Sequence, residues 1–213
     1  MARRASTRPV RKRADRYHHG DLRRALLQAA VGTIGSHGVD GLTLRGVGSA
    51  LGVSRTALYR HFTDKAALLA AVAAEGFRML RTELAESWDR SGRGLRGFKA
   101  MGEAYVRFAV AHPSHYRVMF GADIFNVEHA ELAQEGPGAF QVLVDAITEL
   151  QRQQLARKDE ARQMALFVWA ATHGVAMLAI DGRLGNESAA IDNLTRYATE
   201  RIQAAIAIRE IDD

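Results

Sequence analysis

Residues 54–61, with the sequence SRTALYRH, carry side-chain types that read the edges of DNA bases. An arginine pairs bidentately with guanine, and a threonine or alanine methyl group contacts the methyl group of thymine. We therefore assign base reading to Arg55, Thr56 and Ala57. Arg60 lies on the same outward side of this segment, and Arg45 could reach a phosphate or a base edge.

Two short helices joined by a tight turn must position these side chains, and residues 44–62 predict that arrangement. The apolar residues form two short stripes, which are Leu44, Val47 and Leu51, then Val53, Leu58 and Phe62. Gly52 supplies the turn, and the small Gly48 allows the two helices to cross closely. The second helix then presents its polar residues to the major groove of a duplex.

The composition is that of a globular and mostly helical protein. Of the 213 residues, 47% are hydrophobic, 25% are charged and only three are proline. The absence of cysteine excludes disulfides, thiolate metal sites and a cysteine nucleophile. We find no secretory signal, and no apolar run approaches the roughly 18–20 residues of a membrane span. We therefore expect a soluble, cytoplasmic protein without membrane contact.

Positive charge gathers at the amino-terminal end of the chain. Residues 1–16 hold seven Arg or Lys and one Asp, a charge of +6, so the rest of a chain with net charge +5 sums to −1. We expect residues 1–16 to be a disordered basic arm that enters the minor groove beside the helix-turn-helix. The alternative is a solvated tail that only aids solubility.

Hydrophobic periodicity predicts an all-α fold of about nine helices without a strand. The expected N-cap residues are Asp21, Thr43, Ser54 and either Thr63 or Asp64. We expect Gly38 to end the first helix, and Gly136-Pro137-Gly138 to break the chain between a segment at about 126–135 and the next helix. The expected helices cover residues 21–36, 44–51, 55–61, the stretch from 64 or 65 to a turn at 91–94, 95–111, 115–120, 139–155, 159–180 and 189–208.

The stretch LTLRGVGSALGVSRTALYRHFTDKAALL resembles the DNA-binding domain of TetR-family transcriptional regulators. The similarity lies in Thr43 opening the second helix, Gly52-Val53-Ser54 at the turn, Leu58-Tyr59-x-His61-Phe62 at the end of the third, and Lys65 opening the fourth. It implies a homodimer that binds a near-palindromic operator, usually as a repressor. It also implies a cavity in the C-terminal domain, where an effector changes the spacing of the two DNA-binding heads and releases DNA.

The resemblance and the chemistry of hydrogen-bond donors together assign phosphate contacts to Thr43, Ser54, Tyr59, His61 and Lys65. For two of them an alternative is open, because Tyr59 could pack its ring and expose only its hydroxyl, and His61 could cap the third helix. The family layout divides the chain into the arm at 1–16, a helix-turn-helix domain at 17–65, and an effector-binding and dimerisation domain at 66–213.

Part of the C-terminal domain is similar to a subgroup of the family that carries a Trp…His-Gly signature. The matching residues are Trp169-x-x-x-His173-Gly174, the upstream stretch from His112 to Phe120, and the lead-in Tyr17-His-His-Gly20.

An effector cavity requires an apolar wall with one or two polar groups. Trp169, His173 and Met177 recur every four residues on one helix face, and His173 must find a partner or accept a ligand. The residues that could surround this face are Tyr105, Phe108, Tyr116, Met119, Phe120 and Phe140. For each of these residues the alternative is plain core packing.

The last two expected helices predict a dimer interface. Helix 159–180 is apolar on nearly every side and must be covered on all of them. The final helix carries an apolar stripe formed by Ile191, Leu194, Ala198, Ile202 and Ala205. We expect a homodimer through residues 159–180 and 189–208, and the alternative is a core contained in one chain.

The motifs of enzymes are missing. His112-x-x-His115 is the one metal-like spacing, and no carboxylate accompanies it. We find no phosphate-binding glycine loop and no nucleophile elbow, so we expect no cofactor, no metal and no catalysis. The alternatives are a nucleoid-type DNA binder that responds to no effector and, less favoured, a helical enzyme.

Overall fold

The computed structural model describes residues 19–124, 128–185 and 187–208, with side chains from Leu22 onward. The expected arm at 1–16 and the lead-in at Tyr17 lie outside these limits. The expected N-cap at Asp21 is wrong, because α1 already begins at His19 and Asp21 lies inside the helix. In the described ranges every regular element is a helix, and the β contact found there is one isolated bridge between Ala156 and Ala207. This confirms the all-α fold. The helices are α1 His19–His37, α2 Leu44–Ala50, α3 Arg55–Tyr59, α4 Lys65–Arg90, α5 Leu95–Ala111, α6 Pro113–Met119, the 3-10 helix η1 Ala122–Ile124, α7 Ala130–Arg152, α8 Ala161–Ile180 and α9 Ser188–Ile206.

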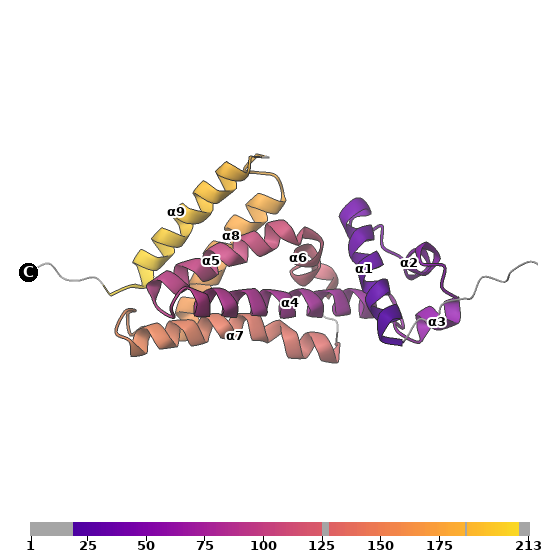
Figure 1. Ribbon diagram of the computed structural model, residues 1–213, viewed down its shortest axis with the longest axis horizontal. Helices are drawn as coiled ribbons and strands as arrows, with labels where there is room; N and C mark the ends of the chain where they lie inside the picture. Colours follow the sequence, from indigo (N-terminus) through magenta and orange to yellow (C-terminus); the bar gives the residue numbers. More distant parts are fainter. Residues whose placement is uncertain (1–18, 125–127, 186, 209–213) are drawn as a thin grey trace, which may run out of the picture.

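The head consists of α1, α2 and α3, which lie together at the right of Figure 1, and it ends where α4 begins at Lys65. Each later helix start in the head has the cap that the sequence predicts. The Thr43 hydroxyl accepts the Gly46 N–H at 3.0 Å, the Ser54 hydroxyl accepts the Ala57 N–H at 3.2 Å, and the Asp64 carboxylate accepts the Ala67 N–H at 2.8 Å. These bonds satisfy backbone donors that would otherwise lack partners at the helix ends.

Both predicted glycine roles in the head are confirmed. Gly52 has φ +64°, and a Cβ at Gly48 would stand 3.2 Å from Leu58 Cδ2, so the two helices meet closely there. Leu58 and Phe62 are buried as predicted. Leu51 differs, because it follows the last residue of α2 and remains 36% exposed instead of joining the apolar stripe.

Helix α4 joins the head to the larger domain, and Figure 1 shows it running along the length of the molecule. It packs against α5, α6 and α7, while α8 packs against α5, α7 and α9. The buried apolar residues of the head and of this domain form one continuous core, which includes Leu68, Leu80 and Ile147.

The expected break at Gly136-Pro137-Gly138 is wrong, because α7 continues through these residues. Proline removes only one helical N–H, and packing along α4 outweighs that loss. Gly138 assists the contact, since a Cβ there would stand 3.1 Å from the Arg81 side chain. That space allows Arg81 Nη1 to reach 3.1 Å from Glu135 Oε2.

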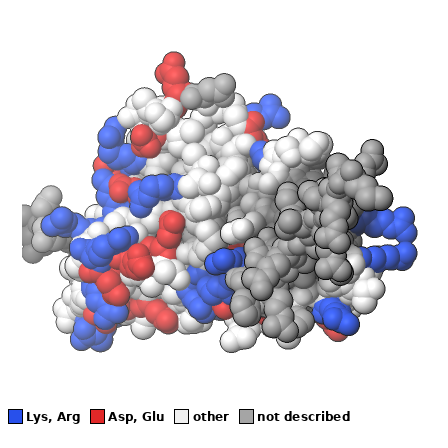
Figure 2. Space-filling model, turned by 45° about the vertical axis from the view of Figure 1, so that its right-hand side comes forward, with Lys and Arg blue, Asp and Glu red and all other residues white. Residues whose placement is uncertain are grey.

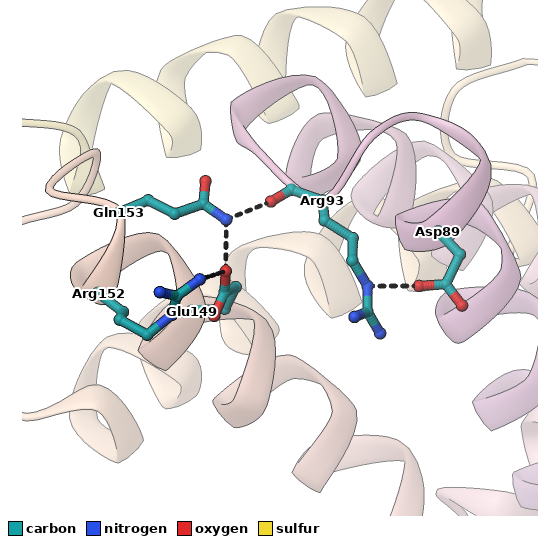
Figure 3. Close-up of polar contacts among 5 residues, drawn as sticks. All are labelled: Asp89, Arg93, Glu149, Arg152 and Gln153. Carbon is teal, nitrogen blue, oxygen red and sulfur yellow. Dashed lines mark hydrogen bonds and ion pairs between the residues drawn. The ribbon is translucent and has the colours of Figure 1, made fainter.

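The loops that follow α4 and α7 are tied together at the end of the domain away from the head (Figure 3). Gln153 Nε2 donates to the Arg93 carbonyl at 2.9 Å and to Glu149 Oε1 at 2.6 Å, and Arg93 Nε donates to Asp89 at 2.7 Å. The hydrogen bond from Arg152 is the main cause that lowers the pKa of Glu149 to about 2. Polar side chains thus fix the ends of two helices whose middles pack through apolar contacts.

Helix α8 corrects the expectation that no apolar run approaches the length of a membrane span. Among the described helices it is the one that is long and apolar enough, with 39% of its 18-residue window buried in the protein. It packs against three other helices, which is also the pattern of a core helix in a domain without a membrane.

Candidate functional site

The predicted DNA-contacting side chains of α3 lie on the surface of the head. Ser54, Arg55, Thr56 and Arg60 are exposed, and Ala57 is half-buried. Arg45 and Thr43 are exposed on and before α2. In Figure 2, Lys and Arg mingle with Asp and Glu over the visible part of the larger domain, and basic side chains project at the opposite, head end.

The capping hydroxyls of Thr43 and Ser54 can still donate a hydrogen bond to a phosphate. Thr43 and Ser54 each accept a backbone N–H with a lone pair, so each hydroxyl hydrogen can still be donated. A helix start also presents backbone N–H groups to an anion. The two caps therefore combine a structural role with a donor at the surface.

The remaining predicted contacts differ in how they are held. Tyr59 is 40% exposed, and the Arg55 guanidinium lies 5.5 Å from its ring centroid. Lys65 Nζ donates to the Val39 carbonyl at 2.8 Å, which ties the start of α4 to the loop after α1. An ammonium has two further hydrogens, so this bond leaves a phosphate contact chemically open. His61 is half-buried.

A cavity of about 270 Å³ lies in the larger domain between α4, α5, α7, α8 and α9. Four of the predicted residues line it: Tyr105, Phe120, Phe140 and Trp169. Its wall is strongly apolar and rich in aromatic rings. The residues that the sequence did not single out include Phe77, Phe98, Gly102, Leu143, Val168, Thr172, Thr199 and Ile202.

The other predicted wall residues do not line this cavity. Phe108 is fully buried, with its ring 5.0 Å from the ring of His112. Met119 fills space against Gly76, where a Cβ would stand 2.5 Å from its sulfur. Met177 packs against the core from a half-buried position. These three residues pack in the core, as the alternative interpretation of the sequence expected.

Tyr116 and His173 lie behind the wall and form a polar cluster with Tyr105 and Trp169. Trp169 Nε1 donates to the Tyr105 hydroxyl at 3.0 Å. The two tyrosine hydroxyls are 2.9 Å apart, and His173 Nδ1 lies 2.6 Å from the Tyr116 hydroxyl and 3.1 Å from that of Tyr105. The partner that an imidazole on an apolar face requires is thus inside the protein.

Burial keeps this cluster uncharged at neutral pH. It raises the pKa of Tyr105 to about 12, raises that of Tyr116 further, and lowers the pKa of His173 below its usual 6.5. A neutral His173 can accept the Tyr105 hydrogen at Nδ1, because the Tyr116 hydroxyl donates its own hydrogen to Tyr105.

Two of the unpredicted lining residues, Thr172 and Thr199, could have been noticed in the sequence, because each is a polar residue on the inward face of its helix. Both are buried. Each hydroxyl bonds to a carbonyl of its own helix, at 2.8 Å from Thr172 to Val168 and at 2.9 Å from Thr199 to Thr195. A Cβ at Gly102 would stand 2.7 Å from Thr199 Cγ2, a contact that sequence spacing does not reveal.

Helix α6 connects the head with the cavity. A Cβ at Gly35 of α1 would stand 3.1 Å from Ser114 Oγ, and His115 Nε2 lies 3.2 Å from Glu75 Oε2 of α4. That hydrogen bond is the main cause that lowers the pKa of Glu75. The next residue, Tyr116, belongs to the polar cluster, and Phe120 lines the cavity.

The metal-like spacing of His112 and His115 does not build a metal site in the described residues, where no group of three or more candidate ligands gathers. His115 is engaged with Glu75, and the ring of His112 packs against Phe108.

Apolar side chains remain exposed on the last two helices. Phe167 of α8 is 53% exposed, and Leu166, Leu178 and Tyr197 are also exposed. The stripe predicted on α9 is only partly available, because Ile202 is buried and lines the cavity. The inward face of α9 is instead formed by Thr195, Thr199, Ile202 and Ile206.

Two family models match the chain. One describes bacterial regulatory proteins of the tetR family and matches residues 26–72, and the other describes a Tetracyclin repressor-like C-terminal domain and matches residues 98–202. No curated protein matches.

Solved structures resemble the whole chain. A protein of unknown function from Rhodococcus sp. RHA1 is 33% identical and has a TM-score of 0.80, with 91% of this chain and 100% of that one covered. A TetR-family transcriptional regulator from Pectobacterium atrosepticum is 19% identical and has a TM-score of 0.70, with 91% of this chain and 98% of that one covered.

Proposed function

Because the chain belongs to the TetR family of DNA-binding transcriptional regulators, we propose that it represses its target genes from a near-palindromic operator and leaves that operator when an effector enters the cavity. The family binds double-stranded DNA, dimerises and responds to small molecules. The observation that carries the proposal is a capped, exposed recognition helix joined by α4 to a separate apolar cavity.

In this proposal the head reads DNA through α3. Arg55, Thr56 and Ala57 contact base edges, and Arg60 and Arg45 reach a base edge or a phosphate. The remaining predicted contacts hold phosphates, and these are Thr43, Ser54, Tyr59, His61 and Lys65. The exposure of the arginines and of the capping hydroxyls supports these roles.

We propose a homodimer in which α8 and α9 of two chains pack about a twofold axis. Phe167, Leu166 and Leu178 support this interface, because large apolar side chains of one helix are exposed in the single chain. The dimer also accounts for the low burial of α8 without a membrane, so we propose a soluble, cytoplasmic protein. It divides into the arm at 1–16, the head at 17–65 and the effector and dimer domain at 66–213.

We further propose that the effector is a small apolar or aromatic molecule. Its signal would reach the head through α6, which touches α1 and α4 on one side and supplies Tyr116 to the cluster behind the cavity wall. An effector acts only if it binds the DNA-competent and DNA-incompetent forms with different affinities.

A gel shift and a footprint on the promoter region of the protein's own gene test the proposal. We expect a symmetric footprint with half-sites about one or two helical turns apart. Arg55→Ala should weaken binding, and Arg90→Ala, an exposed arginine at the far end of α4, should not. Binding without sequence preference would instead support a nucleoid-type protein, and equal loss in both variants would contradict the assigned contact.

Deletion of residues 1–16 tests the arm. We expect weaker binding and a flatter dependence on salt, because each phosphate contact contributes about 0.9 to the slope of log K against log salt concentration. An unchanged slope would remove the arm from the proposed interface.

A further inference from the structure

The polar side chains of the cavity wall use their hydrogen bonds inside the protein. The Tyr105 oxygen has three neighbours at hydrogen-bond distance, from Trp169, Tyr116 and His173. A phenol oxygen offers one hydrogen and two lone pairs, so three partners use its whole capacity. The N–H of Trp169, its one donor, is spent on the same oxygen.

The remaining polar wall residues are also paired. The hydroxyls of Thr172 and Thr199 donate to carbonyls of their own helices. Lys99 Nζ lies 2.8 Å from Glu200 Oε1 and 4.0 Å from Glu103 Oε1. Its charge is thus compensated by two carboxylates before any ligand arrives.

In the described part of the chain, the buried side-chain atoms without a hydrogen-bond partner are His129 Nδ1 and Glu135 Oε2, and neither residue lines the cavity. Glu135 Oε2 forms an ion pair with Arg81 Nη1 at 3.1 Å. The hydrogens of the Tyr105, Thr172 and Thr199 hydroxyls and of the Trp169 indole are thus donated inside the protein. A ligand group that needs a hydrogen-bond donor would find only Lys99, whose charge two carboxylates already compensate.

The volume and the shape of the wall limit the ligand further. A dry apolar cavity of about 150 Å³ holds one benzene ring, so the 270 Å³ found here suits about two fused rings. Phe120 and Phe140 present their rings about 6 Å from Trp169, and the ring planes of Phe140 and Trp169 are inclined by 60°. Such walls offer edge-to-face contacts to a flat aromatic molecule.

From these observations we infer that the cavity selects an uncharged two-ring hydrocarbon without a hydrogen-bonding group, the chemistry of naphthalene. This inference rests on the proposed role of the cavity as the effector site. A carboxylate would have to share Lys99 with Glu200 and Glu103, and no Asp or Glu of the described residues lines the cavity to receive an ammonium.

Three probes of matched shape test this selectivity on the full-length protein: naphthalene, quinoline and 2-naphthoate. Binding is followed by intrinsic tryptophan fluorescence and by thermal shift. We expect naphthalene to bind more tightly than quinoline and at least about tenfold more tightly than 2-naphthoate, because the carboxylate gives up water and must share Lys99 with two carboxylates of the protein. Equal or tighter binding of quinoline or 2-naphthoate, or no binding of naphthalene, would overturn the inference.

Tyr105→Phe tests whether the paired cluster sets the selectivity. The variant leaves the Trp169 N–H without its acceptor, so the ring nitrogen of quinoline gains a donor that naphthalene cannot use. We expect the ratio of the quinoline Kd to the naphthalene Kd to fall about 2- to 10-fold, the factor of one neutral hydrogen bond. A loss of stability alone would not change this ratio, and an unchanged ratio would contradict the inference.

Ala139→Phe tests the location, because Ala139 lines the cavity and a phenyl ring there would fill it. Ala133→Phe places the same ring on an exposed position of α7 and is the control. We expect naphthalene binding to be lost only in the first variant. Leu143→Trp, at another wall position, repeats the test if Ala139→Phe does not fold. Naphthalene binding retained by a folded wall variant would overturn the location.

The two proposals fail separately. A protein that prefers naphthalene but never leaves its operator when naphthalene binds would contradict the effector role and support the selectivity of the cavity. A protein that binds its operator and prefers 2-naphthoate would contradict the selectivity and leave the DNA-binding function intact.

Discussion

The head and the larger domain start their helices in different ways. In the head, α2, α3 and α4 each begin at a side chain that bonds to the backbone three residues on. In the larger domain, the starts of α5, α6, α7 and α9 have no side-chain cap, and only α8 has one, from Glu160. Local sequence therefore specifies the head, whereas contacts between distant helices specify the larger domain.

The functional residues follow the same division. The proposed DNA contacts of the head come from one stretch between Thr43 and Lys65, and most of them are exposed. The cavity wall runs from Phe77 to Ile202 and draws on five helices. A substitution in the head should act locally, and one in the cavity should act on the packing of the whole domain.

Leu58→Ala should have the largest effect. Leu58 is buried in the part of the core that the head contributes, and truncation of a buried leucine costs about 2–5 kcal/mol. We expect loss of DNA binding with retained binding of naphthalene in the cavity, measured by gel shift and fluorescence. Leu51→Ala is the matched control, because Leu51 is exposed and its removal should cost under about 0.5 kcal/mol. Loss of the cavity in Leu58→Ala would show that the two regions are one cooperative unit.

His173→Phe should follow in size. It removes the Nδ1 acceptor 3.1 Å from the buried Tyr105 hydroxyl, since Tyr116 donates its own hydrogen to Tyr105, and an unpaired buried donor costs about 1–3 kcal/mol. The free energy of unfolding from urea titrations measures this loss. His173→Asn keeps an acceptor near Nδ1 and should restore part of the stability. Equal values for both variants would mean that ring packing, and not the hydrogen bond, holds the cluster.

These two sites also show how far the sequence predicts the structure. The caps at Thr43 and Ser54 and the close approach at Gly48 were predictable, because residues within a few positions of each other determine them. Tyr105 and Phe108 look equivalent in the sequence, yet one lines the cavity and the other is solidly packed. That difference depends on which neighbours from other helices leave space.

The continuous helix α7 shows a second limit of prediction from local sequence. Gly136-Pro137-Gly138 is a local signal for a break, and packing along α4 overrides it. Local signals thus succeed where local bonds dominate, and fail where a helix is held along its length by a partner.

Gly94→Ser tests the difference in capping directly. Gly94 occupies the N-cap of α5 with extended backbone and no side-chain bond, and an added Cβ would come no closer than 3.4 Å to a neighbour. A serine should stabilise the protein by about 0.5–1 kcal/mol through the cap and the reduced freedom of the unfolded chain. Thr43→Ala should lower stability by about 1 kcal/mol. A destabilised Gly94→Ser would mean that the loop before α5 requires glycine for another reason.

The pH dependence of stability should show the smallest effect. Burial lowers the pKa of His173 below 6.5, so the unfolded chain takes up a proton that the folded protein resists. Stability should therefore fall as the pH drops below about 6.5.

Glu75 affects stability at lower pH. The hydrogen bond from His115 depresses the pKa of Glu75, and the stability that this carboxylate contributes is lost only as the pH falls below 4.5. His173→Asn should flatten the curve between pH 7.5 and about 5.5 and leave the Glu75 window unchanged. Urea titrations from pH 7.5 to below pH 4.5 measure both slopes. A wild-type curve as flat as that of the variant would mean that His173 accepts a proton as readily in the folded protein as in water. The cluster behind the cavity wall would then not supply the uncharged surroundings on which the choice of an uncharged ligand depends.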